Sequence, residues 1–240
     1  MPAASIARTS TRAVRPAALT TRWVPNSAPA VRATPGFLRK MSASTAMRFQ
    51  HPTIFVCDLQ EKFRTAIYQF DNVVTTTEKL LNFAKAVSIP IHCTTQTAAK
   101  LGPTVPAIAA HLTSTPIDKT KFSMLVPELA SQLKPASSVA IVGIESHICV
   151  TQTALDLRDA GHTVYIIADG VSSCNKQEVI IALDRLRAEK GVIVTSSESW
   201  MYECLGDAGH PAFKSVIGIV KNSMANTRTV LDSLPPTPKI

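Results

Sequence analysis

Short apolar runs alternate with amphipathic stretches along the chain from residue 53 onward. Runs such as 53–57 and 163–168 are apolar at nearly every position, whereas 71–87 carries apolar residues at helical spacing. Apolar strands separated by helices indicate a mostly parallel sheet covered on both faces. We therefore expect an α/β fold, a doubly wound three-layer sandwich with a mostly parallel six-stranded sheet. The expected strands are 53–57, 89–94, 114–117, 139–143, 163–168 and 192–195, with helices at 71–87, 125–133, 148–160 and 175–190 and one or two more helices near the end.

The two ends of the chain differ from this middle part. Residues 1–40 are rich in Ala, Ser, Thr and Arg, and the first acidic residue is Asp58. This composition is typical of a mitochondrial transit peptide, so we expect 1–40 to be unfolded and the protein to reach the mitochondrial matrix. A disordered basic arm with no targeting role is the alternative, and initiation at Met41 would give a cytosolic form. The folded domain is expected at 50–221, with 222–240 as a disordered polar tail.

Charge and composition exclude several classes of protein. The first 50 residues hold seven Arg and one Lys, while the other 190 hold 17 basic and 17 acidic residues, so the net charge of +8 belongs to the N-terminal segment. A neutral folded part argues against nucleic-acid binding. No run of 18 apolar residues occurs, so we expect no membrane span. The five cysteines are scattered and odd in number, which favours free thiols over a disulfide scaffold.

Chemically active side chains follow three of the predicted strands. Asp58 follows the first strand, Lys119 the third, and Cys149 the fourth, after Gly143. The carboxyl ends of parallel strands meet at one edge of a doubly wound sheet, where ligands bind. A thiol at a helix N-terminus beside a lysine favours the thiolate, and a carboxylate can move its proton. Each residue also has a structural alternative, as a strand end, a solvated loop charge or a packed thiol.

These residues lie in segments that resemble the isochorismatase-like cysteine hydrolases, and most closely the isochorismatase domain-containing proteins of eukaryotes. The resemblance covers about residues 52–221, nearly the whole folded part. It rests on several ordered motifs at compatible spacing, at 56–60 (VCDLQ), 119–124 (KTKFSM), 143–157 (GIESHICVTQTALDL), 168–173 (ADGVSS) and 195–199 (TSSES).

The resemblance implies a catalytic set of Asp58, Lys119 and Cys149, with Lys121 as the nearby competitor for the lysine position. It further implies a cis peptide between Ile144 and Glu145, with backbone N–H groups directed at an oxyanion. Under this reading the enzyme hydrolyses a small amide or related C–N bond through a thioester. The expected substrate-pocket residues are Gln60, Gln96 and Phe122.

The sequence also departs from the wider superfamily. Nicotinamidases carry a zinc site built on an Asp-x-His motif after the second strand, where this chain has Thr94, Thr95 and Gln96. We therefore predict no metal and no other cofactor. The expected partners are a small-molecule substrate and further copies of the chain in a homo-oligomer, with no nucleic acid and no membrane.

Two rival interpretations stay open. The chain could be a catalytically silent scaffold that keeps the fold for protein association. It could also be a redox-sensing thiol protein, which would need a second cysteine within reach of Cys149; Cys57, beside Asp58, is the candidate.

Overall fold

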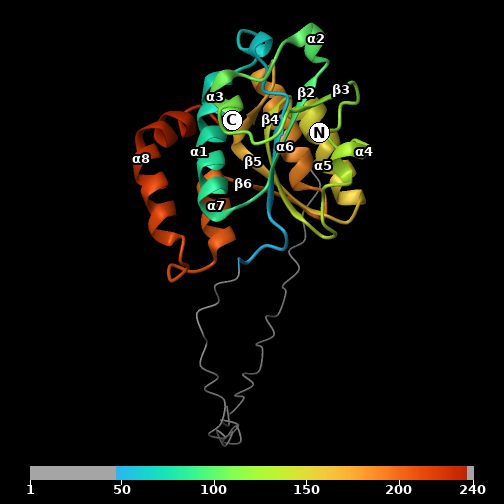
Figure 1. Ribbon diagram of the computed structural model, residues 1–240. Helices are drawn as coiled ribbons and strands as arrows, with labels where there is room; N and C mark the ends of the chain where they lie inside the picture. The colour runs from blue at the N-terminus through green and yellow to red at the C-terminus, as the bar shows by residue number, and fades with distance from the viewer. Residues whose placement is uncertain (1–46, 237–240) are drawn as a thin grey trace, which may run out of the picture. The chain divides into compact units, whose positions relative to one another are not determined.

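The fold is a single six-stranded sheet with helices on both faces (Figure 1). The computed structural model describes residues 47–236. Each pair of neighbouring strands is parallel, and their order across the sheet is β3-β2-β1-β4-β5-β6. This confirms the predicted doubly wound α/β architecture. The strands are β1 (Thr53–Cys57), β2 (Ile91–Gln96), β3 (Ile117–Lys119), β4 (Ser138–Ile144), β5 (Thr163–Ser172) and β6 (Val192–Thr195).

Alternate side chains of β1 enter two separate apolar layers. Ile54 and Val56 pack in one layer, and Phe55 and Cys57 in the other. This follows from the two-residue period of a strand, which sends successive side chains to opposite faces. The first layer lies under α1 (Phe70–Val87), α3 (Pro106–Ala109), α7 (Ser197–Leu205) and α8 (Phe213–Leu231), and the second under α4 (Pro127–Ala130), the π-helical turn η2 (Ser146–Val150), α5 (Thr151–Asp159) and α6 (Lys176–Arg187).

Two short helices lie in the loops that follow the first two strands. The 3-10 turn η1 (Glu61–Phe63) follows β1, and α2 (Ala98–Leu101) follows β2. Within the described residues, no helix has both the length and the apolar character that a membrane span requires.

Several observed bounds differ from the predicted ones where packing outweighs the local pattern. The third strand is 117–119 rather than 114–117, so Lys119 lies inside β3 and pairs with Gln96 of β2. The helix expected at 148–160 begins earlier, with the π-helical turn at Ser146.

The prediction of a disordered tail from residue 222 is wrong for most of that segment. Helix α8 continues to Leu231, and the side chains of Val230 and Leu234 are buried. The prediction relied on the polar and proline-rich composition of the segment. It overlooked the apolar stripe of Val216, Val220 and Val230, by which α8 packs against the rest of the core. Residues 1–46 and 237–240, including the predicted transit peptide, lie outside the described residues.

The direction in which successive strands are added to the sheet reverses between β1 and β4. The connections run outward from β1 in one direction through β2 and β3, and from β4 in the other through β5 and β6. In open α/β sheets, ligands bind at this switch point, beyond the carboxyl ends of the strands. Asp58 directly follows β1, and the turn with Cys149 follows β4.

Glycine at position 143 allows the two central strands to approach closely there. Gly143 pairs with Cys57, and its φ angle is +113°. A Cβ atom at this position would lie 2.1 Å from the carbonyl oxygen of Cys57, which is impossible without moving the backbone. Glycine at this position therefore allows the turn that follows β4 to pass close to the end of β1.

Candidate active site

The end of β1 and the turn after β4 bring a carboxylate and two thiols together. The Sγ atoms of Cys57 and Cys149 and a carboxylate oxygen of Asp58 lie within 4.8 Å of one another. All three residues are buried, and Cys149 is 7 % exposed. The structure thus brings Asp58 and Cys149 together, although they are 91 positions apart in the sequence.

Lys119 enters the site from β3 and holds the carboxylate. Its Nζ atom lies 2.7 Å from Asp58 Oδ2, and both side chains are almost fully buried. The same ammonium donates hydrogen bonds to Gln96 Oε1 at 2.7 Å and to the carbonyl oxygen of Phe122 at 3.1 Å. An ammonium has three N–H donors, and here each has an acceptor. Lys119 is therefore fixed in position, and it is bonded to Asp58 rather than exposed to solvent.

The other oxygen of Asp58 is also occupied. Thr94, on β2, donates its hydroxyl to Asp58 Oδ1 at 2.8 Å. Cys57 donates its thiol to Asp58 Oδ2 at 3.6 Å. Asp58 has a φ angle of 49°, a conformation that Asp tolerates better than most residues. The carboxylate is thus oriented by β1, β2 and β3 together.

Cys149 lies in a π-helical turn rather than in a regular helix. The turn spans Ser146–Val150 and continues directly into α5. Thr153 donates its hydroxyl to the carbonyl oxygen of Cys149 at 2.6 Å, and Thr151 donates to that of Ser146 at 2.6 Å. π-Helical turns inside helices occur often at functional sites. The peptide bond between Ile144 and Glu145, just before this turn, is cis, at the position that the resemblance implied.

A cavity of about 200 Å³ opens onto Cys149. The surfaces of Asp58 and Cys149 form part of its wall, and apolar side chains form much of the rest. A cavity of this size is smaller than those that hold drug-sized ligands. Its nine lining residues are Asp58, Phe63, Gln96, Leu101, Phe122, Ile144, Glu145, Ile148 and Cys149.

The predicted pocket residues have different positions. Gln96 and Phe122 line the cavity, and the side chain of Phe122 is half exposed. Gln60 does not line it. Its buried side chain accepts a hydrogen bond from the Gln96 amide at 2.7 Å and donates to the carbonyl oxygen of Gly102 at 2.6 Å. We therefore correct the assignment of Gln60, which holds the β2 end and its loop in place.

The competitor lysine lies outside the site. Lys121 is exposed, and its Nζ atom lies 2.7 Å from Asp156 Oδ2 on α5. Lys119 is thus the lysine in contact with Asp58.

Sequence reasoning missed several residues of the cavity. It also missed Thr94, which does not line the cavity but donates a hydrogen bond to Asp58. Thr94 could have been found, because it lies at the end of a predicted strand and the rule for strand ends applies to it. Phe63 and Leu101 lie in the short helices η1 and α2, whose positions the apolar pattern did not predict.

Cys57 and Cys149 differ in their access to the cavity. Burial raises the pKa of the Cys57 thiol well above its ordinary value, and its contact with Cys149 and the negative charge of Asp58 raise it further. Cys57 is fully buried and does not line the cavity. Cys149 is therefore the thiol that a molecule in the cavity can reach.

Within residues 47–236, two groups of side chains offer donor atoms of the kind that zinc accepts. One is the Cys57, Asp58 and Cys149 cluster, and the other is Glu145, His147 and Cys174, whose ligand atoms also lie within 4.8 Å of one another. Both groups already make hydrogen bonds. In the second, Glu145 accepts from the Cys174 amide at 2.8 Å, and His147 Nδ1 lies 2.9 Å from Ser173 Oγ.

The residues that stand where nicotinamidases carry their zinc motif make other contacts in this chain. Thr94 and Gln96 bond to Asp58 and Lys119 as described above, and Thr95 donates its hydroxyl to Asp118 Oδ1 at 2.8 Å.

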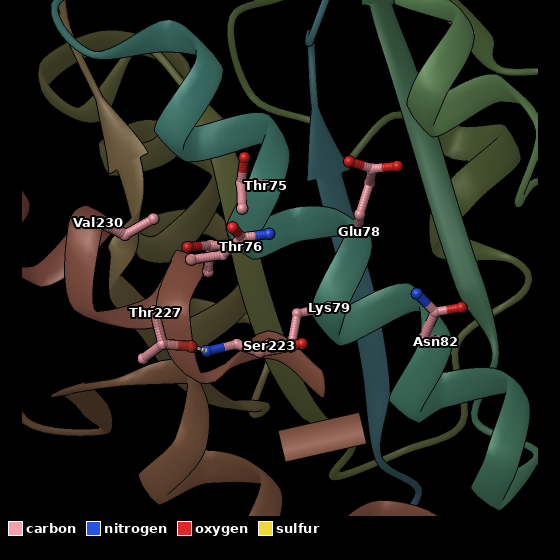
Figure 2. A pocket seen from close by; sticks show the side chains of 9 residues that line it. Thr75, Thr76, Glu78, Lys79, Asn82, Ser223, Thr227 and Val230 are labelled. Atoms are coloured by element: carbon pink, nitrogen blue, oxygen red, sulfur yellow. Dashed lines mark hydrogen bonds between the residues drawn. The ribbon is translucent and has the colours of Figure 1, made fainter. Parts of the chain in front are cut away.

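A second hollow, of about 210 Å³, lies between α1 and α8 and is lined mainly by polar side chains (Figure 2). Lys79 of α1 donates a hydrogen bond to Thr227 Oγ1 of α8 at 2.9 Å, and its Nζ atom lies 3.9 Å from Glu198 Oε1. Its lining residues include neither a cysteine nor a histidine. By contrast, the cavity at the switch point is lined by both the Cys149 thiol and the Asp58 carboxylate.

Comparisons with known proteins agree with the observed fold. The family model described as the isochorismatase domain matches residues 52–199. The chain is 40 % identical over 179 residues to a secreted isochorismatase effector, Isc1, of Phytophthora sojae, covering 71 % of this chain and 85 % of that protein. It is 40 % identical to isochorismatase domain-containing protein 2 of Xenopus laevis, covering 70 % and 82 %.

A solved structure from Caenorhabditis elegans, described as MAR1 ribonuclease, has the same fold. It is 39 % identical, with a TM-score of 0.70, and the match covers 79 % of this chain and 96 % of that one.

Proposed function

Because this chain belongs to the isochorismatase family, we propose that it is a metal-independent cysteine hydrolase acting on a small amide or a related C–N bond. The family assignment inferred from the motifs is thereby confirmed, and the fold is that of isochorismatase-like hydrolases. The observation that carries the proposal is the cluster itself. An ion-paired carboxylate and a cysteine thiol lie within 4.8 Å of each other, and both line one cavity.

In the proposed reaction, Cys149 is the nucleophile and Asp58 moves the proton. Asp58 accepts the thiol proton as sulfur attacks the carbonyl carbon, and it then protonates the departing nitrogen. The product of this step is a thioester on Cys149 and a free amine or ammonia. Water, deprotonated by Asp58, then attacks the thioester and releases the carboxylic acid and the thiol. Asp58 supplies the base, so the proposal requires no metal ion.

Lys119 has an electrostatic role in this scheme. Its ammonium holds Asp58 in its orientation before the reaction, because it donates a hydrogen bond to the carboxylate at 2.7 Å. Backbone N–H groups between Glu145 and Cys149 are the proposed donors to the oxyanion that forms on the carbonyl oxygen.

The cavity limits the substrate class. A volume of about 200 Å³ admits a molecule of few non-hydrogen atoms. Phe63, Leu101 and Ile148 favour an apolar group on the acyl side of that molecule. We propose a small aliphatic or aromatic amide.

The descriptions of the relatives suggest other substrates, and the cavity argues against one of them. The C. elegans relative is described as a ribonuclease. A site for a polynucleotide needs a groove with cationic side chains along the backbone, whereas the side chains lining this cavity include no Lys or Arg. Cleavage of a labelled RNA oligonucleotide that disappears in Cys149→Ala would replace our proposal with that activity.

The experiment that tests the proposal combines turnover with trapping. Wild type, Cys149→Ala and Cys149→Ser are incubated with a panel of small primary amides, including acetamide, butyramide and benzamide, and ammonia release is measured. An active acyl ester, p-nitrophenyl acetate, is used to detect acylation by intact mass. We expect ammonia release and one acyl group on Cys149 in wild type, and neither in the variants.

Cys174→Ser is the matched control, because this exposed thiol lies outside the cavity lining. It should behave as wild type. Undiminished turnover in Cys149→Ala would contradict the mechanism. A wild type with no turnover and no acylation would favour the rival interpretation of a silent scaffold.

A further inference from the structure

The cluster at the active site contains a second thiol that the proposed hydrolysis does not use. Cys57 is the last residue of β1, and its Sγ atom lies within 4.8 Å of Cys149 Sγ and of an Asp58 carboxylate oxygen. The two thiols belong to the same apolar layer of the core. A disulfide needs its sulfur atoms about 2.05 Å apart, so the two side chains must move toward each other to form one.

We propose that a small hydroperoxide oxidises Cys149 and that Cys57 then captures the oxidised sulfur as a Cys57–Cys149 disulfide. The site would thus be a reversible modification site, with hydroperoxides as a second class of reactant. The inference shares Cys149 with the proposed hydrolase and needs this thiol to be reactive, but it does not depend on amide hydrolysis.

The first step takes place in the cavity. The Cys149 thiolate attacks one oxygen of the hydroperoxide, the O–O bond breaks, and a sulfenic acid forms together with an alkoxide, which takes up a proton to become an alcohol. Sulfur loses two electrons, and the peroxide gains them. Cys149 lines the cavity whereas Cys57 is fully buried, so Cys149 is the thiol that reacts first.

In the second step, Cys57 sulfur attacks the sulfenic sulfur of Cys149. The S–S bond forms, the S–O bond breaks, and the leaving hydroxide takes the Cys57 proton to give water. Asp58 is placed to carry that proton, because Cys57 donates its thiol to Asp58 Oδ2 at 3.6 Å. The sum is two thiols and one hydroperoxide giving one disulfide, one alcohol and one water.

The arrangement also explains why Cys57 would not compete for the peroxide itself. Burial and the nearby carboxylate raise the pKa of the Cys57 thiol, so it stays protonated at rest, and a thiol is a poor nucleophile. It gains its role only when the sulfenic acid stands beside it. The disulfide would block the nucleophile, protect it from irreversible oxidation, and return it on reduction.

The other cysteines give no such partner for Cys149. The buried Cys93 thiol donates to the carbonyl oxygen of Thr94 at 3.7 Å, and burial raises its pKa to about 12. Cys204 packs against Met47, with its Sγ atom 3.7 Å from the Met47 sulfur. Cys174 is exposed and adjoins Glu145. Cys93→Ser is thus the matched control for a substitution at Cys57.

The test measures the oxidation products of Cys57 and Cys149 in the intact protein. Reduced full-length wild type, Cys57→Ser, Cys57→Ala and Cys93→Ser are treated with hydrogen peroxide or tert-butyl hydroperoxide in buffer with a metal chelator. Peptides are then analysed by mass spectrometry without reduction. We expect the peptides of residues 57 and 149 to be cross-linked in wild type and in Cys93→Ser, with full return of the free Cys149 thiol after dithiothreitol.

In both Cys57 variants, we expect Cys149 to proceed to the sulfinic acid, so that dithiothreitol no longer restores the thiol. Stable sulfinic acid in wild type, without a cross-linked peptide, would overturn the inference whether or not the variants fold. The two proposals fail separately. A cross-link without amide turnover removes only the hydrolase, and turnover without a cross-link removes only this modification site.

Discussion

Two lysines are buried to nearly the same extent in this protein, but their surroundings differ. Lys119 is 4 % exposed and Lys79 is 5 % exposed. Lys119 has an acceptor for each of its three N–H donors, one of them the carboxylate of Asp58. Lys79 donates one hydrogen bond, to Thr227, and its closest carboxylate oxygen, on Glu198, lies 3.9 Å away.

The ammonium of Lys119 is therefore held in place by its acceptors, whereas that of Lys79 is buried with fewer partners. Burial lowers the pKa of Lys79, and the attraction of Asp169 and Glu198 only partly offsets this effect. At Lys119, the carboxylate in direct contact and two further oxygens surround the charge. A buried lysine thus supports chemistry when its acceptors orient it beside a reactive group, and burial alone is insufficient.

The largest expected effect comes from Lys119→Met. Removing one partner of a buried ion pair leaves Asp58 as an unpaired buried charge, which costs about 3–5 kcal/mol of unfolding free energy. The base would also lose the ammonium that orients it, so amide turnover should fall by about 10²-fold or more. Chemical denaturation and ammonia release measure the two effects.

The double variant Asp58→Asn with Lys119→Met serves as the control for this loss. It removes both charges, so it should recover most of the stability and none of the activity. A Lys119→Met protein with wild-type turnover would contradict the assigned role of Lys119.

A smaller effect is expected from Gln96→Met. This change removes the Oε1 acceptor of Lys119 and also the donor to the carbonyl oxygen of Thr120. One ammonium proton then lacks a partner, at a cost of about 1–3 kcal/mol. Turnover should fall by roughly tenfold, as a barrier change of about 1.4 kcal/mol implies.

Gln132→Met is the matched control for Gln96→Met, because Gln132 is exposed, donates its side-chain amide to the carbonyl oxygen of Glu128 and does not line the active-site cavity. Its stability and turnover should equal those of wild type. If Gln96→Met has the same full turnover, the coordination of Lys119 is not what keeps the site active.

The smallest effect is expected from Lys79→Met, the same substitution at the loosely paired lysine. Its unfolding free energy should change by no more than about 1 kcal/mol, because an apolar side chain of similar length replaces a charge that burial disfavours. Turnover should remain at the wild-type value. A loss as large as that of Lys119→Met would remove the distinction between the two lysines.

The pH dependence gives a second readout for Lys79. Its pKa in the folded protein lies below its ordinary value of 10.5, so the charged form opposes folding at neutral pH. The unfolded chain binds more protons between the two values, and this penalty is lost as pH rises through them. The stability of wild type relative to Lys79→Met should therefore increase with pH in that window, and a flat difference would refute the lowered pKa.

The sequence predicted the layers of the fold and the strand ends that bear Asp58 and Cys149, because both depend on local apolar patterns. It could not predict that residues of β2 and β3 would both donate hydrogen bonds to Asp58 at the end of β1. The contact of Lys119 with Gln96 depends on the pairing of β2 with β3, and the contact of Thr94 with Asp58 depends on the pairing of β1 with β2. A local apolar pattern does not reveal which strands pair. The role of Gln60 was unpredictable for a similar reason, since a polar residue after a strand can either line a cavity or form hydrogen bonds that hold a loop.

The prediction for the C-terminal segment was wrong for a different reason. Residues 222–231 are mainly polar and lack a continuous apolar run, yet they complete α8. Their helix is stabilised by packing of a few apolar residues against the core, which composition does not reveal.

The most direct test of the central claim is the rate at which iodoacetamide alkylates Cys149 at neutral pH, followed by peptide mass spectrometry in wild type, Lys119→Met and Lys79→Met. The account predicts rapid alkylation of Cys149 in wild type and in Lys79→Met, faster than at Cys93 or Cys204, and a clear slowing in Lys119→Met. Equal rates in all three proteins, or a Cys149 no more reactive than the buried Cys93, would contradict the claim that Asp58 and Lys119 activate this thiol.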